Sequence, residues 1–389
     1  MGPERQLANT PRIAAIRTAV VHVTTRTNWV FVLVETDDDR LGVGEATLDG
    51  HEPQVSAEVA AAARELAGQP AIPTLPALRP HPGAFGGLAH AAARSAIEQA
   101  LWDLLGQRFG APVSELLGGP ASGAVRLYAN VNRSTLASRS PEAFAAAARG
   151  AVSAGFRAVK VTPFDGLRWE PEQERPARAL IDAGLARIHA VRAEVGPGVD
   201  LLIDCHGRFN PRTAVVVVRE MEAIDPYWIE APVPERDLEG WRHVRDSTNA
   251  RLAGGEFLVG LEAHRRFIAA TGVDVVMPDV KYCGGIGGLM AVTALAASFG
   301  TAVAPHDPSG PVSTAATAHA ALASGADQIV EFAWGETTWR SDLVSGGETL
   351  DGGRYVLADR PGLGVQLDET LAALHPFAET PVSPDLWER

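Results

Sequence analysis

Three short stretches of this chain repeat one pattern, an apolar run that ends in an acidic residue. The acids are Asp204, Glu230 and Glu256, and each follows the previous one after 26 residues. That interval is about the length of one strand-plus-helix unit, and a short apolar run bounded by turn residues is typical of a buried parallel strand. Three successive strands of this kind deliver their acids to one mouth of a barrel, because the carboxyl ends of parallel strands lie on the same side.

A cation is the simplest way to hold these three acids together. Like charges packed at one mouth repel one another unless something positive sits between them. A ligand set made only of carboxylate oxygens suits a hard divalent ion, of which Mg²⁺ is the usual choice. A single acid at a strand end is more often a helix N-cap than a metal ligand, but the equal spacing favours the metal site. We therefore predict that Asp204, Glu230 and Glu256 bind Mg²⁺.

The rhythm of strand and helix signals divides the 389 residues into three parts. Residues 1–124 begin with alternating strands and continue with alanine-rich helices, which predicts an α+β domain. Residues 125–345 alternate strand and helix, and their eight strand signals match the strand number of a (β/α)₈-type barrel. Residues 346–389 are rich in loops and are expected to pack back on the first domain. The strands are expected at 125–131, 157–162, 200–205, 227–231, 251–255, 274–278, 301–305 and 328–332.

Composition restricts the partners and the compartment of the protein. The net charge is −13 and no basic stripe is visible, which argues against a nucleic acid or an anionic membrane as partner. No apolar run is long enough to span a bilayer, and residues 1–11 lack the apolar core of a signal peptide. Cys205 and Cys283 are too few for a disulfide framework and are expected to be buried small residues. We therefore expect a cytoplasmic protein.

An ionisable residue follows every expected barrel strand except the first. Taken singly, several have a simple structural explanation: Lys160 is typical of an ion-paired or solvated lysine, and Lys281 is best explained as a surface charge. His306 also fits a Pro-His-Asp-Pro turn, and Arg26 and Trp29 fit either a lid over a site or plain surface. As an ordered set, the residues at the strand ends predict a functional site. The set comprises Lys160, Asp204, His206, Arg208, Glu230, Glu256, Asp279, Lys281, His306, Asp307 and Glu331.

These residues resemble the enolase superfamily, mandelate racemase subgroup, over nearly the whole chain. The likeness is strongest to acid-sugar dehydratases of the galactonate dehydratase type. Enzymes of this superfamily combine a Lys or His base with Mg²⁺ that stabilises an enediolate. The resemblance implies a modified TIM barrel, (β/α)₇β, with an N-terminal α+β capping domain. It also implies a Mg²⁺-dependent dehydratase that converts an aldonate-type acid sugar into a 2-keto-3-deoxy acid. It is carried by residues 204–208, 278–279, 283–285, 304–311, 331 and 360–365.

The resemblance also implies a role for each of these side chains. His306, oriented by Asp279, would be the base that removes the proton α to the carboxylate, and His206 would be the acid that helps the β-hydroxyl leave. Glu331 would hydrogen-bond the enediolate if it is protonated, and Lys160 would pair with the substrate carboxylate. Further substrate contacts are expected from Thr162, Arg208, Trp29 and Arg26, with specificity loops at 22–29 and 81–85.

Three positions depart from the family pattern. Thr162 stands where racemases of the subgroup have a second lysine, which counts against racemisation by two bases. Ala231 and Phe257 stand beside the expected metal ligands, where the dehydratases often have an acid and an arginine. These two changes leave the ligands intact, and they leave the identity of the acid sugar open.

Two alternatives therefore stay beside the dehydratase. The first is a racemase or epimerase that acts through the same enediolate and pairs His306 with His206 or Lys281 as second base. The second is a non-catalytic barrel that binds an acid, against which the intact His306, Asp279 and His206 speak. The resemblance further implies a small-molecule carboxylate substrate and a homo-oligomer, a dimer or an octamer.

Overall fold

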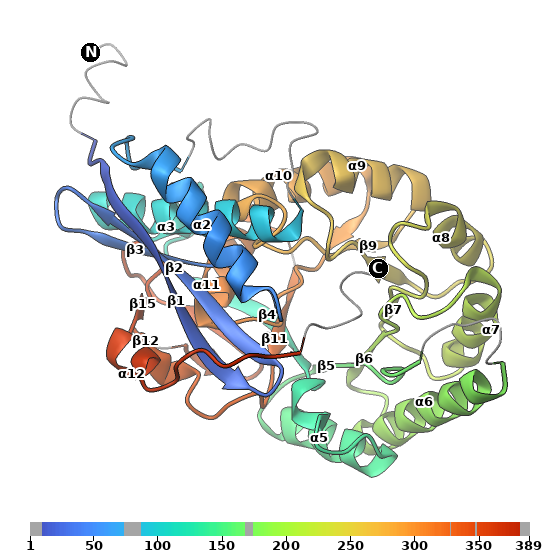
Figure 1. Cartoon of the computed structure of the whole chain (residues 1–389). Helices are drawn as coiled ribbons and strands as arrows, with labels where there is room; N and C mark the ends of the chain where they lie inside the picture. Colours follow the sequence, from blue (N-terminus) through green and yellow to red (C-terminus); the bar gives the residue numbers. More distant parts are fainter. Residues whose placement is uncertain (1–9, 74–86, 168–173, 327, 347, 382–389) are drawn as a thin grey trace.

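The structure is a computed structural model (Figure 1), in which no helix of the described residues is long and apolar enough to cross a membrane. The structure describes residues 10–73, 87–167, 174–326, 328–346 and 348–381. The expected specificity loop at 81–85 lies outside these residues.

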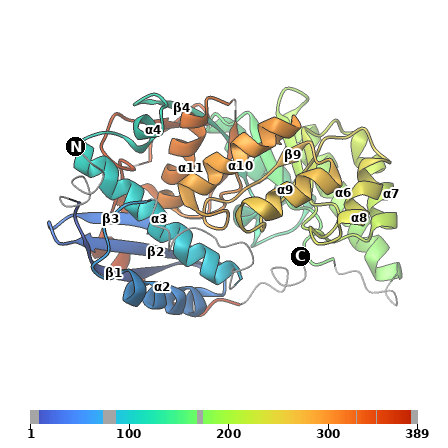
Figure 2. The same cartoon turned by 90° about the horizontal axis from the view of Figure 1, so that it is seen from above.

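An antiparallel sheet with two helices forms the N-terminal domain. The sheet order is β1 (Ile13–Thr24), β2 (Thr27–Thr36) and β3 (Leu41–Glu45), and α2 (Glu52–Leu66) and α3 (Leu88–Phe109) lie against it (Figure 2). Helix α3 lies unusually close to β3, because a Cβ atom on Gly44 would come within 1.9 Å of the carbonyl oxygen of Ala96. The short helix α4 (Val113–Leu116) follows.

Strand β2 is buried on both faces and joins two hydrophobic cores. Side chains alternate along a strand, so neighbouring residues point to opposite faces. Val30, Val32 and Val34 pack with α2 and α3, whereas Phe31 and Leu33 belong to the core that is shared with the second domain. The N-terminal domain therefore packs on the second domain through the face of its sheet that carries Phe31 and Leu33.

Eight parallel strands follow, and within the described residues they alternate with seven helices. Neighbours in the chain are neighbours in the sheet from β4 to β10, and β11 pairs with β4 on its other side. The backbone N–H of Glu331 in β11 donates to the carbonyl of Pro305, just after β10, at 3.2 Å, so the sheet curves back on itself. We call these strands and helices the barrel domain. The predicted class, an α/β fold with an N-terminal antiparallel cap, is confirmed.

The helices of the barrel domain lie on the outside of its strands (Figure 1). Its strands are β4 (Gly123–Asn130), β5 (Ala158–Val161), β6 (Asp200–Asp204), β7 (Trp228–Glu230), β8 (Leu252–Gly254), β9 (Val275–Val276), β10 (Ala302–Val303) and β11 (Ile329–Ala333). Its helices are α5 (Pro141–Ser153), α6 (Glu174–Val195), α7 (Pro211–Glu222), α8 (Leu238–Arg245), α9 (Gly260–Thr271), α10 (Gly285–Phe299) and α11 (Pro311–Ser324).

Inward-pointing side chains of these strands form an apolar layer beneath a polar one. Residues two apart on a strand point to the same side, so Leu202 lies below Asp204 and Trp228 lies below Glu230. The apolar layer fills the lower part of the barrel domain, and the polar residues collect at the end that faces the cap. The lower layer is a buried cluster of Tyr128, Ala158, Leu202, Trp228, Ala253, Val275, Met277, Ala304 and Ile329.

The C-terminal segment contacts both domains. Strand β14 (Arg354–Leu357) pairs with β4, and β13 (Leu350–Asp351) pairs with β14. Strand β15 (Gln366–Leu367) pairs with β12 (Val344–Ser345), and α12 (Glu369–Ala373) lies beside β1, where the red end of the chain runs in Figure 1. The boundaries 1–124, 125–345 and 346–389 stay predictions, because this segment divides its contacts between the two domains.

Candidate active site

The three spaced acids converge at the mouth of the barrel domain. Asp204 and Glu230 end neighbouring strands and are directly paired in the sheet, and Glu256 follows the next strand after one glycine. All three are buried, and one ligand oxygen from each lies within 4.8 Å of the others. Burial, together with the charges of Asp204 and Glu256, raises the pKa of Glu230 well above its ordinary value. A donor set of clustered, buried carboxylates fits a divalent cation, which removes this repulsion.

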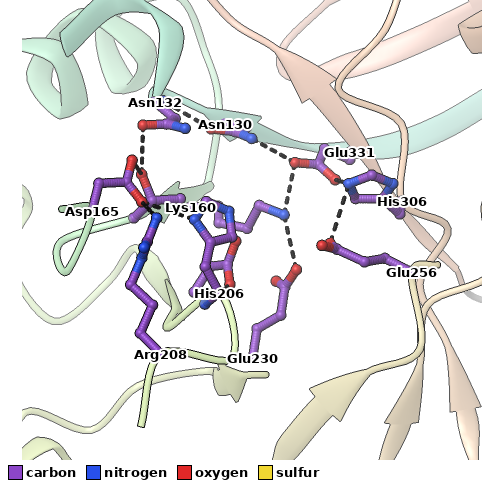
Figure 3. Close-up of polar contacts among 12 residues, drawn as sticks. Asn130, Asn132, Lys160, Asp165, His206, Arg208, Glu230, Glu256, His306 and Glu331 are labelled. Atoms are coloured by element: carbon purple, nitrogen blue, oxygen red, sulfur yellow. Dashed lines mark hydrogen bonds and ion pairs between the residues drawn. The ribbon is translucent and has the colours of Figure 1, made fainter. Parts of the chain in front are cut away.

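Lys160 lies deep in the same group and is already paired. Its Nζ atom is 3.1 Å from Glu230 Oε1 and 2.7 Å from Glu331 Oε1 (Figure 3). Burial opposes the charge, but Glu230 and Glu331 raise the pKa of Lys160, so it stays protonated. Lys160 and His306 in turn hold the pKa of Glu331 below its ordinary value against the effect of burial. Glu331 is therefore ionised in this arrangement, and the protonated form that would donate to an enediolate is disfavoured.

Asp279 contacts the Nδ1 nitrogen of His306. The Nδ1 atom of His306 lies 2.8 Å from Asp279 Oδ2, and Nε2 lies 3.2 Å from Glu256 Oε2. An isolated parallel bridge beyond the ends of β9 and β10 brings Asp279 and His306 side by side. Burial lowers the pKa of His306, but Glu256, Glu331 and Asp279 outweigh it and raise that pKa overall. This pairing leaves Nε2 as the atom that faces the carboxylates and the cavity.

Lys281 is not a surface charge, so that expectation is wrong. Its side chain is 1% exposed, and its Nζ lies 2.7 Å from Asp279 Oδ2. Although burial opposes it, Asp279 raises the pKa of Lys281, which keeps the ammonium charged. Lys281 follows Asp279 by two residues, and it lines the same cavity as His306. Asp279 is thereby shared between a lysine and His306.

His206 lies on the opposite side of the three acids, on a strained turn. Its Nδ1 lies 2.8 Å from Asp165 Oδ1, and its Nε2 lies 2.6 Å from Asp204 Oδ2 (Figure 3). Its backbone has φ 52° and the next residue, Gly207, has φ 64°, a conformation that few side chains tolerate. The apolar strand therefore ends in a turn that carries the imidazole beside the carboxylate of Asp204 instead of away from it.

Several polar residues of the site were missed by the sequence analysis. Asn130 ends β4 and Asn132 follows it, at a strand end where only ionisable residues were considered. Asn130 Nδ2 donates to Glu331 Oε1 at 2.6 Å, and Asn132 Oδ1 accepts from the Thr162 hydroxyl at 2.5 Å (Figure 3). Asp165 lies in the turn after β5, and its signal, an acid three residues after Thr162, could have been included with the other strand ends. These residues link the two histidine sides of the site around its rim.

A cavity of about 480 Å³ opens above these groups, between the barrel mouth and the cap. Lys160, His206, Arg208, Glu256 and His306 line it, as do the cap residues Arg26, Thr47, Leu48 and Asp49. Phe257 also lines it, with its ring 6.0 Å from that of His306.

Two expected substrate contacts do not reach this cavity. Trp29 is fully buried, with its ring 5.8 Å from that of Trp339 and 5.3 Å from the guanidinium of Arg340. Thr162 is 1% exposed, and its hydroxyl is used by Asn132. The structure therefore does not support a substrate contact by Trp29, because alternation along β2 turns this ring toward the barrel core. Thr162 lies one layer behind the wall of the cavity.

Comparisons with known proteins agree with this geometry. Residues 5–118 match the mandelate racemase/muconate lactonizing enzyme N-terminal domain, and residues 143–371 match the enolase C-terminal domain-like family. A D-galactonate dehydratase of Verminephrobacter eiseniae is 32% identical over 88% of this chain and 90% of its own length. A D-gluconate dehydratase of Thermoproteus tenax is 36% identical over 72% of this chain, which spans about half (55%) of that enzyme.

Solved structures are similar over the same range. A mandelate racemase/muconate lactonizing enzyme-like protein from Rubrobacter xylanophilus has a TM-score of 0.86 and 32% identity, with 96% of this chain and all (100%) of that chain covered. A mandelate racemase/muconate lactonizing enzyme from Jannaschia has a TM-score of 0.84 and 29% identity, with 95% and 99% covered. Both domains and their order thus agree, and this chain belongs to the mandelate racemase/muconate lactonizing enzyme family of the enolase superfamily.

Proposed function

We propose that the protein is a Mg²⁺-dependent dehydratase of an aldonate-type acid sugar, a carbon–oxygen lyase that yields a 2-keto-3-deoxy acid. The observation that carries the proposal is the pair of histidines on opposite sides of the three carboxylates, each with its own acid on Nδ1. Removal of an α-proton and loss of a β-hydroxyl need one group that takes a proton and one that gives a proton. The names of the two dehydratases that resemble the chain support the same reaction class.

The α-proton is the part of the reaction assigned to His306. Asp279 holds Nδ1 of His306, so Nε2 is the atom that accepts the proton. The charged Lys281, whose Nζ contacts Asp279 Oδ2, keeps that acid ionised. An ionised Asp279 stabilises the imidazolium that forms when His306 takes up the proton. Glu256 and Glu331 lie on the Nε2 side and stabilise the same positive charge.

Protonation of the departing β-hydroxyl is assigned to His206. Its Nε2 faces the carboxylates from the side opposite His306, and it gives a proton so that the hydroxyl leaves as water. The resulting enol takes up a proton at the β-carbon and becomes the 2-keto acid. Lys160 stays charged between Glu230 and Glu331, where it supplies fixed positive charge beneath the substrate carboxylate.

Asp204, Glu230 and Glu256 would hold the metal ion. The buried acidic triad and the family support a metal, and the all-oxygen donor set favours Mg²⁺. A bound Mg²⁺ supplies positive charge that stabilises the negative charge developing on the substrate carboxylate.

One of the two candidate second bases of the epimerase alternative, Lys281, is disfavoured. Lys281 is a poor second base, because its ammonium is paired with Asp279 and its pKa is raised, not lowered. His206 stays as the possible second base, since it approaches from the side opposite His306. A non-catalytic barrel that binds an acid is disfavoured by the buried His306–Asp279 pair, for which binding alone gives no reason.

A panel of aldonic and aldaric acids tests the proposal. With Mg²⁺ in deuterated water, at least one aldonate is expected to give a 2-keto-3-deoxy acid, measured as 2-keto acid and by mass. Epimerised acid without any keto acid would replace the dehydratase by the epimerase. Binding of an acid with neither keto acid nor α-deuterium would favour the non-catalytic barrel.

The quaternary structure and the compartment are further parts of the proposal. A homo-oligomer, a dimer or an octamer, is expected from the resemblance, and light scattering of the purified protein tests it. A cytoplasmic location rests on the cysteine content and composition of the sequence, and fractionation of producing cells tests it.

A further inference from the structure

Asp165 makes a contact that the proposed mechanism does not yet use. It lies in the turn after β5, far along the chain from β6, and its Oδ1 is 2.8 Å from His206 Nδ1 (Figure 3). The His306 Nδ1–Asp279 Oδ2 distance on the other side of the carboxylates is also 2.8 Å. The site therefore contains two histidine–carboxylate pairs with the same distance at Nδ1, one on each side of the expected metal.

The carboxylate of Asp165 is itself held by two arginines. Arg208 Nη2 lies 3.1 Å from Oδ1, and Arg139 Nη2 lies 3.4 Å from Oδ2. The Thr162 hydroxyl, whose proton goes to Asn132, lies 3.4 Å from Oδ2. Arg139 is anchored in turn by Asn132 at 3.0 Å, and Arg208 by the carbonyl of Leu167 at 3.0 Å. The two arginines come from stretches of chain outside the turn of Asp165 and are anchored themselves, so the carboxylate of Asp165 is held in place independently of His206.

From this arrangement we infer that Asp165 is the positioning residue of His206. The inference rests on the proposed function, in which His206 gives a proton to the departing hydroxyl. The backbone turn at His206 places the ring, and Asp204 Oδ2 holds Nε2 at 2.6 Å; Asp165 holds the other nitrogen, Nδ1, so that the two contacts together fix the rotation of the imidazole. Asp165 accepts the Nδ1 proton, which directs Nε2 toward the carboxylates and keeps Nε2 as the nitrogen that exchanges a proton with the substrate.

This assignment predicts that Asp165 affects only the step that needs a proton donor. Asp165→Asn should lower dehydration about 10–100-fold, the usual effect of removing the partner of a functional histidine. Exchange of the substrate α-hydrogen in deuterated water should change less than about threefold, because His306 is held by another acid. A purely structural role would lower both rates together.

A substrate with a better leaving group separates the two explanations. In a 3-deoxy-3-fluoro aldonate, the α-proton passes to His306, its bonding pair forms the carbon–carbon double bond, and fluoride leaves with the pair of the C–F bond. No proton donor is needed, and the product is the same 2-keto-3-deoxy acid. Fluoride release by Asp165→Asn should therefore stay within a few-fold of the unmodified enzyme. Loss of fluoride release in step with dehydration would overturn the assignment.

Matched variants show whether Asp165 acts through His206. Asp200→Asn is the same change at the other end of β6, where the carboxylate faces Arg126 at 3.4 Å, and it should leave both rates unchanged. Asp165→Asn added to His206→Asn should lower dehydration no further, because the residue that Asp165 positions is gone. A multiplied loss in the double variant would contradict the inference. Should Asp165→Asn not fold, Asp165→Ser, which is smaller and still polar, takes its place.

A measurement without turnover makes the result independent of the proposed reaction. Nitrogen NMR of the Mg²⁺-loaded protein, with the His206 signals identified by their loss in His206→Asn, reports which ring nitrogen carries a proton. Nδ1 should be protonated in the unmodified protein and should change in Asp165→Asn. An unprotonated Nδ1 in the unmodified protein would refute the role of Asp165 even if no aldonate is dehydrated. A failed substrate panel with protonated Nδ1 would instead count against the proposed function alone.

Discussion

At the scale of single residues, both α-hydrogen exchange and dehydration should depend on His306. His306→Asn is expected to lose both dehydration and α-hydrogen exchange, by about 10²–10⁴-fold, because the group that takes the proton is gone. Mass spectrometry of the substrate and product in deuterated water measures both rates. His243→Asn, an exposed histidine on α8, is the control and should change neither. Robust exchange in His306→Asn would move the base to another group, of which His206 is the best placed.

The metal site gives a second residue-scale prediction. Glu230→Gln keeps the volume of the side chain but removes one of three carboxylates, so Mg²⁺ affinity and dehydration should both fall steeply while the protein stays folded. Calorimetric titration with Mg²⁺ and the keto-acid assay measure the two losses. The control Glu262→Gln changes an exposed side chain on α9 and should have neither effect. Full activity of metal-stripped protein in a chelator would refute the metal proposal.

Residues with a regular place in the sequence were the ones that could be predicted. Asp204, Glu230 and Glu256 are equally spaced in the sequence at the ends of buried strands, and in the structure their carboxylates form one cluster. Asp165 was missed because it lies in an irregular turn, and its partner is 41 residues away. The sequence did not reveal that Lys281 lies inside, because a charged residue after a short strand points either way until the packing above it is known.

At the scale of elements, Glu45 joins the cap to the helix that follows His306. It ends β3, and its carboxylate accepts from the backbone N–H of Gly310 at 2.6 Å and of Ser313 at 2.9 Å, at the start of α11. Glu45→Ala leaves these buried donors without an acceptor, which should lower the free energy of unfolding by about 1–3 kcal/mol. Activity should fall as well, because α11 begins five residues after His306.

Denaturant unfolding and the keto-acid assay measure the two effects of Glu45→Ala. Glu262→Ala on the exposed face of α9 is the matched control, and a surface change of this kind usually shifts stability by less than about 0.5 kcal/mol. An unchanged unfolding midpoint in Glu45→Ala would mean that water replaces the lost carboxylate without loss.

The strands of the barrel domain were predicted to within a few residues, because each is a short apolar run bounded by turn residues. Strands expected at 157–162 and 328–332 are found at Ala158–Val161 and Ile329–Ala333. The attachment of β14 to β4 was not predicted, because pairing between distant strands depends on which edge stays open after the barrel domain has formed. Local pattern determines the elements, and long-range contacts determine where the C-terminal elements pack.

At the scale of the whole molecule, buried neutral histidines should shape stability against pH. His319 on α11 accepts from the backbone N–H of Ser114 at 3.1 Å, and burial lowers its pKa to about 4 from the ordinary 6.5. The unfolded chain therefore takes up a proton near pH 6.5, whereas the folded protein does so only near pH 4. Stability from this residue is complete above pH 6.5 and is lost as the pH falls toward 4, by about 3 kcal/mol at most.

His319→Gln should remove this part of the pH dependence. Urea unfolding at several pH values between 4.5 and 8 measures it as the difference between the variant and the unmodified protein. That difference should shrink as the pH falls, because only the unmodified protein loses stability through this histidine. His264→Gln on α9 should behave alike, since burial lowers its pKa to about 4 as well. A difference that is constant over this pH range would contradict the prediction.

The contact between Arg17 of β1 and Glu369 of α12 joins residues that are 352 positions apart. Nearby, the backbone N–H of His22 donates to His375, and Asn28 donates to Ala378, so the hairpin that carries Arg26 is bounded by the last described part of the chain. During synthesis, this hairpin is made 350 residues before the segment that Asn28 contacts. The wall of the cavity that carries Arg26 therefore stays open on this side until that later segment has been translated.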